Sequence, residues 1–414
     1  MSEQVDHPTE VTDDLPYWPI MRAPGDNFDP PEELRRLAAE KPLRKVRIWD
    51  GSTPWLITGH AAQRALMADP RVSVNTSLPG FPHWHEGHRL TGSGRFVKNL
   101  VNQDPPEHTR LRRMLTPSFT AKRMQALRTE IERITNDLID AMLAGPKPVD
   151  LVEAFALPLP SYMICALLGT PYEDHEFVQT HTAIGINRFA TAEITLSSSV
   201  PMSEYMRRQL ERKLDDPAQD ALSDLAARVK SGELSLVEGT AAGQALLSAG
   251  FETSANMIAL GTLALLQHPD QRAFLEKTDD PAVIANVVEE LLRYLSIIHN
   301  GQRRVALDDI EVAGETIRAG EGIVLELVSA NRDASVFPDA DRLDVQRTGA
   351  SQHHGFGYGT HQCLGQQLAR VELQVAYKAL FDRVPTLELA TTIEEVTFKD
   401  DKLAYGVYDL PITW

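Results

Sequence analysis

The chain has 414 residues, of which 43% are hydrophobic and 24% are charged, a balance that supports a large buried core and excludes a disordered protein. Its formal net charge of −17 at pH 7 argues against nucleic acid as a partner. Two cysteines, Cys165 and Cys363, exclude a disulfide framework and suit a reducing compartment.

The N-terminal segment, Met1 to Asp14, is acidic and polar and lacks the apolar stretch of an export signal or a membrane anchor. We therefore expect a soluble, cytoplasmic protein that does not bind a membrane. An irregular, proline-rich stretch extends to about residue 30, and we expect residues 1–17 of it to be flexible. No linker, low-complexity tract or repeat divides the rest of the chain.

The first regular elements are a predicted helix near Pro31 to Lys41 and two strands, Leu43 to Trp49 and Thr53 to Thr58, joined at the hairpin signal Asp50-Gly51. Helical patterns follow at about 60–69, 108–145 and 151–168. Between the first two, residues 73–102 contain prolines, glycines and three histidines, which predicts a long loop of low regularity. Loops of that length are usually functional, so we expect this one to cover a substrate.

The longest predicted helix runs from the capping-box pattern of Ser235 and Glu238 to about Leu266, and it is apolar on most sides, as in a core helix. Proline at 269 ends it. Helices at about 270–275 and 281–295, short strands, a loop through Pro338, a further helix and a strand-rich tail complete the chain. The predicted class is mainly α with minor β.

Cys363 lies in the run from His353 to Arg370, whose glycines at 355, 357, 359 and 365 allow tight turns and a close approach of the backbone to a flat group. A helical pattern begins directly after the cysteine, and the N-terminus of a helix lowers the pKa of a thiol. The run therefore favours a thiolate that binds haem iron and promotes O–O cleavage. A buried structural cysteine or a phosphate-binding loop are the alternatives.

Two other interpretations of cysteine and histidine are weaker. Cys165, in the apolar run from Tyr162 to Leu168, fits a core residue. A zinc site formed by Cys363 with His353, His354 and His361 is disfavoured because the spacing offers no Cys-x-x-Cys or His-x3-His unit.

The run resembles the ligand loop of the cytochrome P450 superfamily, F-x-x-G-x-H/R-x-C-x-G, because Phe356, Gly359, His361, Cys363 and Gly365 match every fixed position. The resemblance extends from about Trp18 to the C-terminus. It implies one catalytic domain over residues 1–414, rich in helices, with haem b between the long central helix and the cysteine loop. It also implies that the haem contacts Phe356, Gly357, Gly365 and Ala249.

Within the central helix, the sextet Ala249 to Ser254 places a carboxylate beside a hydroxyl in an apolar stretch. Taken alone, this pair fits a threonine bonded back to a carbonyl and a glutamate that reaches solvent, with Gly250 favouring a bend. The sextet also resembles the family's oxygen-activating segment, which implies that Glu252 relays protons and that Thr253 is the oxygen-site hydroxyl. Phe251, where relatives often carry histidine, is a departure that is expected to reshape the pocket without removing the relay.

Buried haem propionates require cationic partners. The family's positions for these partners are matched by His108, Arg112, Arg304 and His361. Glu290 and Arg293 match the family's E-x-x-R motif, in which an arginine from the loop before the ligand segment joins the pair. Arg342 is expected to be that arginine, and all three residues are expected to support the haem pocket without a chemical role.

The resemblance also implies a substrate pocket with small residues over the iron and aliphatic or aromatic walls, which favours a bulky, largely apolar substrate. His299 and Asn300 are expected to add an orienting hydrogen bond. The expected lining residues are Phe81, Trp84, Ile184, Asn187, Ala245, Ile297, Ile298, His299, Asn300 and Leu403.

The function implied is that of a soluble, monomeric monooxygenase of the actinobacterial type, which hydroxylates or epoxidises secondary metabolites or xenobiotics. Because no flavin or nicotinamide domain is fused to the chain, electrons are expected from NAD(P)H through a ferredoxin reductase and a ferredoxin. The basic residues Arg110, Arg113, Lys122 and Arg123 are either the docking patch for this acidic donor or a solvated helix face.

Two alternatives remain. Fungal nitric oxide reductase, which takes hydride directly from NADH, is similar along most of the chain, although adjacent Glu252 and Thr253 favour oxygen activation. The other alternative is a non-catalytic protein that binds or sequesters haem ligands.

Overall fold

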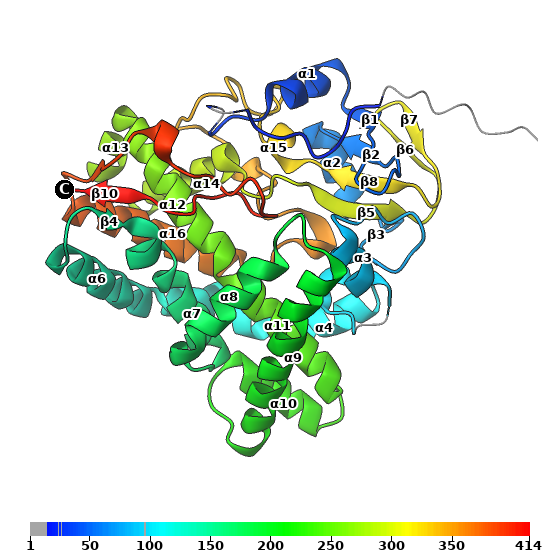
Figure 1. Cartoon of the computed structure of the whole chain (residues 1–414), viewed down its shortest axis with the longest axis horizontal. Coiled ribbons are helices and arrows are strands. Elements are labelled where there is room, and N and C mark those ends of the chain that lie inside the picture. The colour runs from blue at the N-terminus through cyan, green and yellow to red at the C-terminus, as the bar shows by residue number, and fades with distance from the viewer. Residues whose placement is uncertain (1–14, 24, 26, 95–96) are drawn as a thin grey trace, which may run out of the picture.

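The structure is a computed structural model that describes residues 15–23, 25, 27–94 and 97–414 (Figure 1). The helices before residue 216 are α1 Glu32–Glu40, α2 His60–Ala68, α3 Glu86–Gly92, α4 Glu107–Leu115, α5 Ala121–Ala126, α6 Arg128–Ala144, α7 Pro158–Leu168, α8 His175–Gly185 and α9 Ala192–Asp215. Those after it are α10 Ala221–Lys230, α11 Leu236–Gly250, α12 Glu252–Gln267, α13 Pro269–Glu276, α14 Pro281–Leu295, α15 Leu327–Ala330 and α16 Gln366–Arg383. The strands are β1 Leu43–Lys45, β2 Trp55–Ile57, β3 Val72–Ser73, β4 Val149–Asp150, β5 Gln302–Ala306, β6 Ile310–Val312, β7 Glu315–Ile317, β8 Gly322–Leu325, β9 Glu388–Leu389 and β10 Pro411–Thr413.

The largest sheet joins segments that lie far apart in the sequence. Its strand order is β1-β2-β8-β5-β3, with β2 parallel to β8 and the other neighbours antiparallel. The sheet lies at the upper right of the molecule in Figure 1, whereas α6 and α7 lie on the left and α9 and α10 at the bottom. The structure therefore confirms a mainly helical protein with small sheets, and it places the cationic strand β5 inside the largest one.

The central helical stretch crosses the middle of the molecule, where α12 packs against α16, α14 and α7. Leu236–Gln267 is the one stretch of the described residues that is long and apolar enough to cross a membrane, but 78% of its apolar window is buried inside the fold. Helix α11 begins at the predicted capping box, in which Ser235 and Glu238 bond to each other's backbone N–H groups. The stretch has the character of a core helix.

Three predicted segments before the central helical stretch differ in kind or continuity from the structure. Residues 73–102 contain helix α3 and a 3₁₀ turn, Leu100–Asn102, and are not uniformly irregular. Helix α3 begins at a histidine, since Nδ1 of His85 accepts the N–H of His88 at 3.2 Å, and histidine is a weak sequence signal for a helix start. The helix predicted over 108–145 is divided into α4, α5 and α6, because a 3₁₀ turn that contains Pro117, Thr116–Phe119, follows α4 directly. The helix predicted over 151–168 starts with a π-helical turn, Val152–Ala156, before α7.

Most of the N-terminal segment that we expected to be flexible, residues 1–14, lies outside the described residues. Within the described part, the carbonyl of Pro16 accepts the N–H of Arg47 at 2.8 Å.

Candidate active site

The loop that carries Cys363 packs with its backbone against the end of α2. Gly359 has φ +72°, and a Cβ added there would lie 2.6 Å from the carbonyl oxygen of Met67. Glycine is therefore required at this position both by the dihedral angle and by the close approach. The N–H of Cys363 donates to the carbonyl of Phe356 at 2.9 Å, which closes the loop just before α16.

The Cys363 side chain is accessible to solvent although protein surrounds it at longer range. Burial raises the pKa of the Cys363 thiol, and the N–H groups of Gly365 and Gln366 and the guanidinium groups of Arg112 and Arg370 oppose this shift. The expected effect of the helix N-terminus, which lowers the pKa of the thiol, is therefore present, but burial outweighs it. The helix N-terminus is present, but the free energy of desolvating a thiolate is larger.

Four cationic or potentially cationic side chains meet beside the cysteine, as the resemblance implied. The rings of His108 and His361 lie 4.2 Å apart, and His108 is 1% exposed with no hydrogen-bond partner for either ring nitrogen. Burial, followed by the charges of His108, Arg304 and Arg112, lowers the pKa of His361 to about 3. Burial also lowers the pKa of Arg304 to about 10.

No carboxylate of the described residues forms an ion pair with Arg112 or Arg304. Arg304 donates instead to the carbonyl of Arg303 at 2.7 Å and to Oε1 of Gln302 at 2.9 Å. Partly buried cations without acids, beside a buried histidine without partners among the described residues, suit a ligand that carries negative charge. The two propionates of haem fit this requirement.

The backbone around Cys363 also leaves space for a flat group. A Cβ added at Gly365 would meet no heavy atom within 4 Å, and Gly357 has φ +68°. Phe356, directly before Gly357, is partly buried against the main core. Ala249 is exposed although it lies in the middle of the fold. The residues present therefore fit a planar macrocycle ligated by Cys363.

The central helical stretch is interrupted at the predicted sextet. Helix α11 ends at Gly250 and α12 begins at Glu252, with Phe251 between them at φ −113° and ψ −45°. Gly250 is required by close packing, because a Cβ there would lie 2.5 Å from Cδ1 of Ile164. Phe251 is 1% exposed and packs in the main core, so this departure from the family pattern lies away from the accessible surface.

Thr253 and Glu252 face different surroundings. Thr253 is partly accessible, and its hydroxyl donates to the carbonyl of Ala249 at 3.1 Å, which places it on the same side of the helix as that exposed alanine. Glu252 is 7% exposed and its Oε1 accepts Nζ of Lys399 at 3.0 Å. Lys399 also donates to Oδ1 of Asn256 at 2.9 Å. No local sequence pattern indicated this lysine, which lies 147 residues further along the chain.

The E-x-x-R pair has the expected geometry but a different third member. Nε and Nη2 of Arg293 donate to the two carboxylate oxygens of Glu290 at 2.7 and 2.9 Å, and both side chains are fully buried. Arg347 completes the cluster, with its Nε 3.2 Å from each oxygen of Glu290. The assignment of Arg342 is therefore wrong: its side chain is exposed, and only its carbonyl accepts Arg293 and Arg347, at 3.1 and 2.9 Å.

The local backbone explains why Arg347, and not Arg342, joins the buried cluster. Asp339 has φ +52°, and its carbonyl accepts the N–H of Arg342 at 3.0 Å, so a turn precedes Arg342 and leaves its side chain on the surface. Arg347 lies five residues further on and is 8% exposed.

The expected pocket residues lie on segments that the C-terminal tail connects. Leu403 donates its N–H to the carbonyl of Ile186 at 2.9 Å, between Ile184 and Asn187, and Asn187 forms a β-bridge with Lys402. The carbonyl of Lys402 also accepts Nδ2 of Asn300 at 3.0 Å and lies 2.9 Å from Nε2 of His299. Both side chains therefore hold the tail, and these contacts contradict the expectation that they orient a substrate.

The remaining expected lining residues differ in accessibility. Phe81 is 8% exposed, whereas Trp84, Ala245, Ile297 and Ile298 are partly accessible. Phe81 and Trp84 both contact the ring of His88, with centroids 6.1 and 4.4 Å apart. Their role as a substrate pocket stays a prediction.

Comparison with known proteins agrees with this geometry. A family model described as "Cytochrome P450" matches residues 207–384. Cytochrome P450 CYP105Q4 of Mycobacterium marinum is 55% identical over 415 residues, which cover 100% of both chains.

The chain belongs to the cytochrome P450 family.

Solved P450 structures have the same fold. The crystal structure of GfsF, a P450 of Streptomyces halstedii, is 51% identical, has a TM-score of 0.90, and is matched over 96% of this chain and 100% of that one. The mycinamicin VIII C21 methyl hydroxylase MycCI of Micromonospora griseorubida is 36% identical with a TM-score of 0.90, over 97% of this chain and 100% of that one. The expected helix-rich P450 fold is confirmed.

Membership identifies this P450 as a monooxygenase whose cofactor is haem. Cys363 is the residue that would ligate the iron, and His108, Arg112, Arg304 and His361 are those that would hold the propionates. The sequence-based interpretation of this cofactor is confirmed, whereas the roles of individual residues follow from the fit described above.

Proposed function

We propose that this P450 inserts one oxygen atom of O₂, by hydroxylation or epoxidation, into a bulky, largely apolar small molecule such as a secondary metabolite or a xenobiotic. The observation that carries the proposal is the bend between α11 and α12, which presents the accessible Thr253 hydroxyl beside the buried Glu252. When bound, the haem supplies the activation of oxygen, assisted by its thiolate ligand.

The chain's own residues would handle the protons. The Thr253 hydroxyl now donates to a helix carbonyl, an exchangeable bond, so that it can instead donate to an oxygen atom on its accessible side. Glu252 and Lys399 form an acid and base pair one residue away, shielded from bulk water. A shielded pair that can accept and return a proton is what oxygen activation requires of the protein.

The substrate class is supported by what related enzymes act on. One relative, 40% identical over 98% of this chain, is named vitamin D3 dihydroxylase of Streptomyces griseolus. Another, 40% identical over 96% of this chain, is named 20-oxo-5-O-mycaminosyltylactone 23-monooxygenase of Streptomyces fradiae. Both names describe oxidation of a large molecule. The aromatic, aliphatic and alanine residues expected to line the pocket would suit the same class here.

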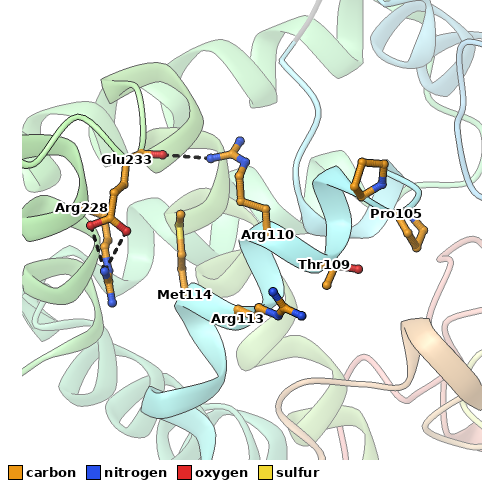
Figure 2. Close-up of a pocket in the computed structure, with 8 residues that line it drawn as sticks. Pro105, Thr109, Arg110, Arg113, Met114, Arg228 and Glu233 are labelled. Carbon is orange, nitrogen blue, oxygen red and sulfur yellow. Dashed lines mark hydrogen bonds and ion pairs between the residues drawn. The ribbon is translucent and has the colours of Figure 1, made fainter.

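We further propose that a ferredoxin, reduced by NAD(P)H through its reductase, supplies the electrons to a cytoplasmic, monomeric P450. Helix α4 carries His108 and Arg112, which would hold the haem, and other residues of the same helix line a surface groove of about 820 Å³ (Figure 2). Arg110 is tied there to Glu238 and to the carbonyl of Glu233, and Arg123 lies 3.6 Å from Asp224. Arg113 and Lys122 are exposed and form no ion pair with a described residue, so these two offer positive charge to an acidic donor.

The test compares T253A with T240A in the haem-loaded enzyme, reconstituted with ferredoxin, its reductase and NADPH. Thr240 makes the same bond to the carbonyl four residues earlier, Leu236 at 2.8 Å, but it is 5% exposed and remote from the sextet, so T240A controls for helix stability. We expect T253A to lower product formed per NADPH by about 10- to 100-fold and to release peroxide instead. T240A should match the parent.

Three outcomes would contradict the proposal. Equal coupling in T253A and T240A would remove the role of Thr253. Rapid NADH-dependent turnover of the ferric nitric oxide complex without ferredoxin would favour the nitric oxide reductase. Binding of ligands with no turnover under any electron donor would favour a sequestering protein.

A further inference from the structure

Glu289, which directly precedes the E-x-x-R glutamate on α14, is a largely buried carboxylate with partners at both ends of the ligand run. Its Oε1 accepts Nε of Arg370 at 2.6 Å, and its Oε2 accepts Nη2 of Arg370 at 3.1 Å and lies 3.1 Å from Nε2 of His353. Burial by itself would raise the pKa of Glu289, but the hydrogen bonds from His353 and Arg370 lower it to about 2. Glu289 is therefore ionised at pH 7 and ties α14 to the first and last residues of the run from His353 to Arg370.

The contacts of His353 fix its tautomer and the start of the ligand loop. Its Nδ1 accepts the N–H of Gly355 at 2.9 Å, so the ring proton is on Nε2, which donates to Glu289. Both ring nitrogens are thus used within the protein, which leaves neither for a metal ion. Gly355 packs closely, since an added Cβ would lie 2.9 Å from that Nδ1 and 3.4 Å from the carbonyl oxygen of Leu292 on α14. The backbone that leads to Cys363 is thereby held against α14.

Phe356 connects the partners of Glu289 to the cysteine. The guanidinium carbon of Arg370 is 4.6 Å from the centre of the Phe356 ring, and the centre of the His353 ring is 5.9 Å from it. The carbonyl of Phe356 accepts the N–H of Cys363 at 2.9 Å. Nη1 of Arg370 also donates to Oε1 of Gln366, in the first turn of α16, at 2.8 Å. A carboxylate, an amide and an aromatic face therefore hold the guanidinium beside a residue that is bonded to the cysteine.

A cation held in this position affects the charge balance of the haem that Cys363 would ligate. One-electron reduction of the iron from the ferric to the ferrous state adds one negative charge to the thiolate site, with the electron taken from an external donor and no bond broken. A nearby positive charge stabilises the state that carries more negative charge. The Arg370 side chain is 21% exposed, so water screens its charge only in part. The paired Glu289 opposes some of this effect, because its negative charge acts in the other direction.

We propose that Arg370 tunes the reduction potential of the haem iron and that Glu289 is the positioning residue that holds its guanidinium over Phe356. With the guanidinium in place, the ferric iron accepts an electron more readily from a separate donor protein. This inference rests on the ligation of haem by Cys363 and does not depend on which molecule the enzyme oxidises.

The equilibrium constant for one-electron reduction of the haem-loaded, substrate-free enzyme tests the proposal, measured by titration with dithionite against a redox dye in the absence of oxygen. We expect R370Q to lower this constant about 10-fold, which corresponds to about 59 mV, because it removes the cation and leaves Glu289 charged. R370K retains the charge and should stay within about threefold of the parent. E289Q keeps a hydrogen-bond acceptor for Arg370 but removes the negative charge, so it should raise the constant by about threefold.

R383Q is the matched control, because Arg383 lies at the other end of α16 and also pairs with a carboxylate, that of Asp140. It changes the net charge of the protein as R370Q does, and it should leave the reduction constant within about twofold of the parent. The carbon monoxide complex of each reduced variant should absorb near 450 nm, which verifies that thiolate ligation is retained. If R370Q binds no haem, the direction of the shift in E289Q decides.

An unchanged reduction constant in R370Q would overturn the proposal, as would an equally large shift in R383Q, a constant in R370K as low as that in R370Q, or a constant in E289Q that does not rise. Because neither substrate nor oxygen enters the measurement, these outcomes leave the proposed function standing. The expected shifts in an enzyme that forms no product with any electron donor would support the role of Arg370 and contradict the proposed function alone.

Discussion

Replacing Arg347 by methionine distinguishes the role that the structure gives to Arg347 from the sequence-based assignment of the same role to Arg342. Arg347 is 8% exposed and donates to both oxygens of the fully buried Glu290 and to the carbonyls of Pro338, Asp339 and Arg342. Loss of one partner of a buried ion pair costs about 3–5 kcal/mol. Arg293 remains bonded to Glu290, which lowers the cost, but the three carbonyls lose charge-assisted hydrogen bonds, which raises it. We therefore expect the free energy of unfolding of R347M to be about 3–5 kcal/mol lower than that of the parent.

The control is R342A, because the Arg342 side chain is exposed and its contributing carbonyl is retained. The free energy of unfolding of R342A should lie within about 0.5 kcal/mol of that of the parent. Urea unfolding followed by circular dichroism measures the free energy, and the absorption of the reduced carbon monoxide complex, near 450 nm for thiolate ligation, reports the haem site. The reasoning would be refuted if R342A lost several kcal/mol while R347M unfolded with the parent.

Two further predictions concern buried carboxylates. K399M should lose about 3 kcal/mol because it leaves Glu252 buried without its cation, and adding E252Q should recover most of this loss in the same unfolding assay; additive losses would contradict the contact at 3.0 Å. Glu372 has no hydrogen bond to either carboxyl oxygen from the described residues, and burial raises its pKa to about 8, only partly opposed by Ser254. Because this folded-state pKa exceeds the ordinary value of 4.5, the free energy of unfolding should fall as the pH rises from about 4.5 to 8. E372Q should remove that decline, whereas the exposed control E394Q should keep it. Equal slopes of the free energy of unfolding against pH in both variants would exclude Glu372 as its source.

Several parts of the site could be predicted from the sequence because they are encoded locally. The glycine pattern, Cys363 and the start of the helix that follows it lie within eighteen residues, so spacing alone specifies the ligand loop. His108 and Arg112 are four residues apart on one helix, which fixes them on the same face. The bend at Gly250 was predictable for a similar reason, although its cause is contact with Ile164 of α7.

Other features could not be predicted because they depend on partners from distant segments. Lys399 reaches Glu252 from the C-terminal tail, 147 residues away, and the carbonyl of Lys402 takes up His299 and Asn300, which the sequence left free for a substrate. Burial of Cys363 by distant segments likewise opposes the lowering of its pKa by the helix N-terminus. Each of these outcomes is set by packing, which no local pattern records.

The sequence by itself thus determined the kind of chemistry, since a thiolate ligand and its loop are specified by residue types at short spacing. Tertiary structure decided how the surrounding charges are paired. It selected Arg347 over Arg342, gave Glu252 a lysine partner, and left Arg303 buried without an acid. The physical reason is that the free energy of a buried charge depends on which groups the whole fold brings within a few ångströms of it.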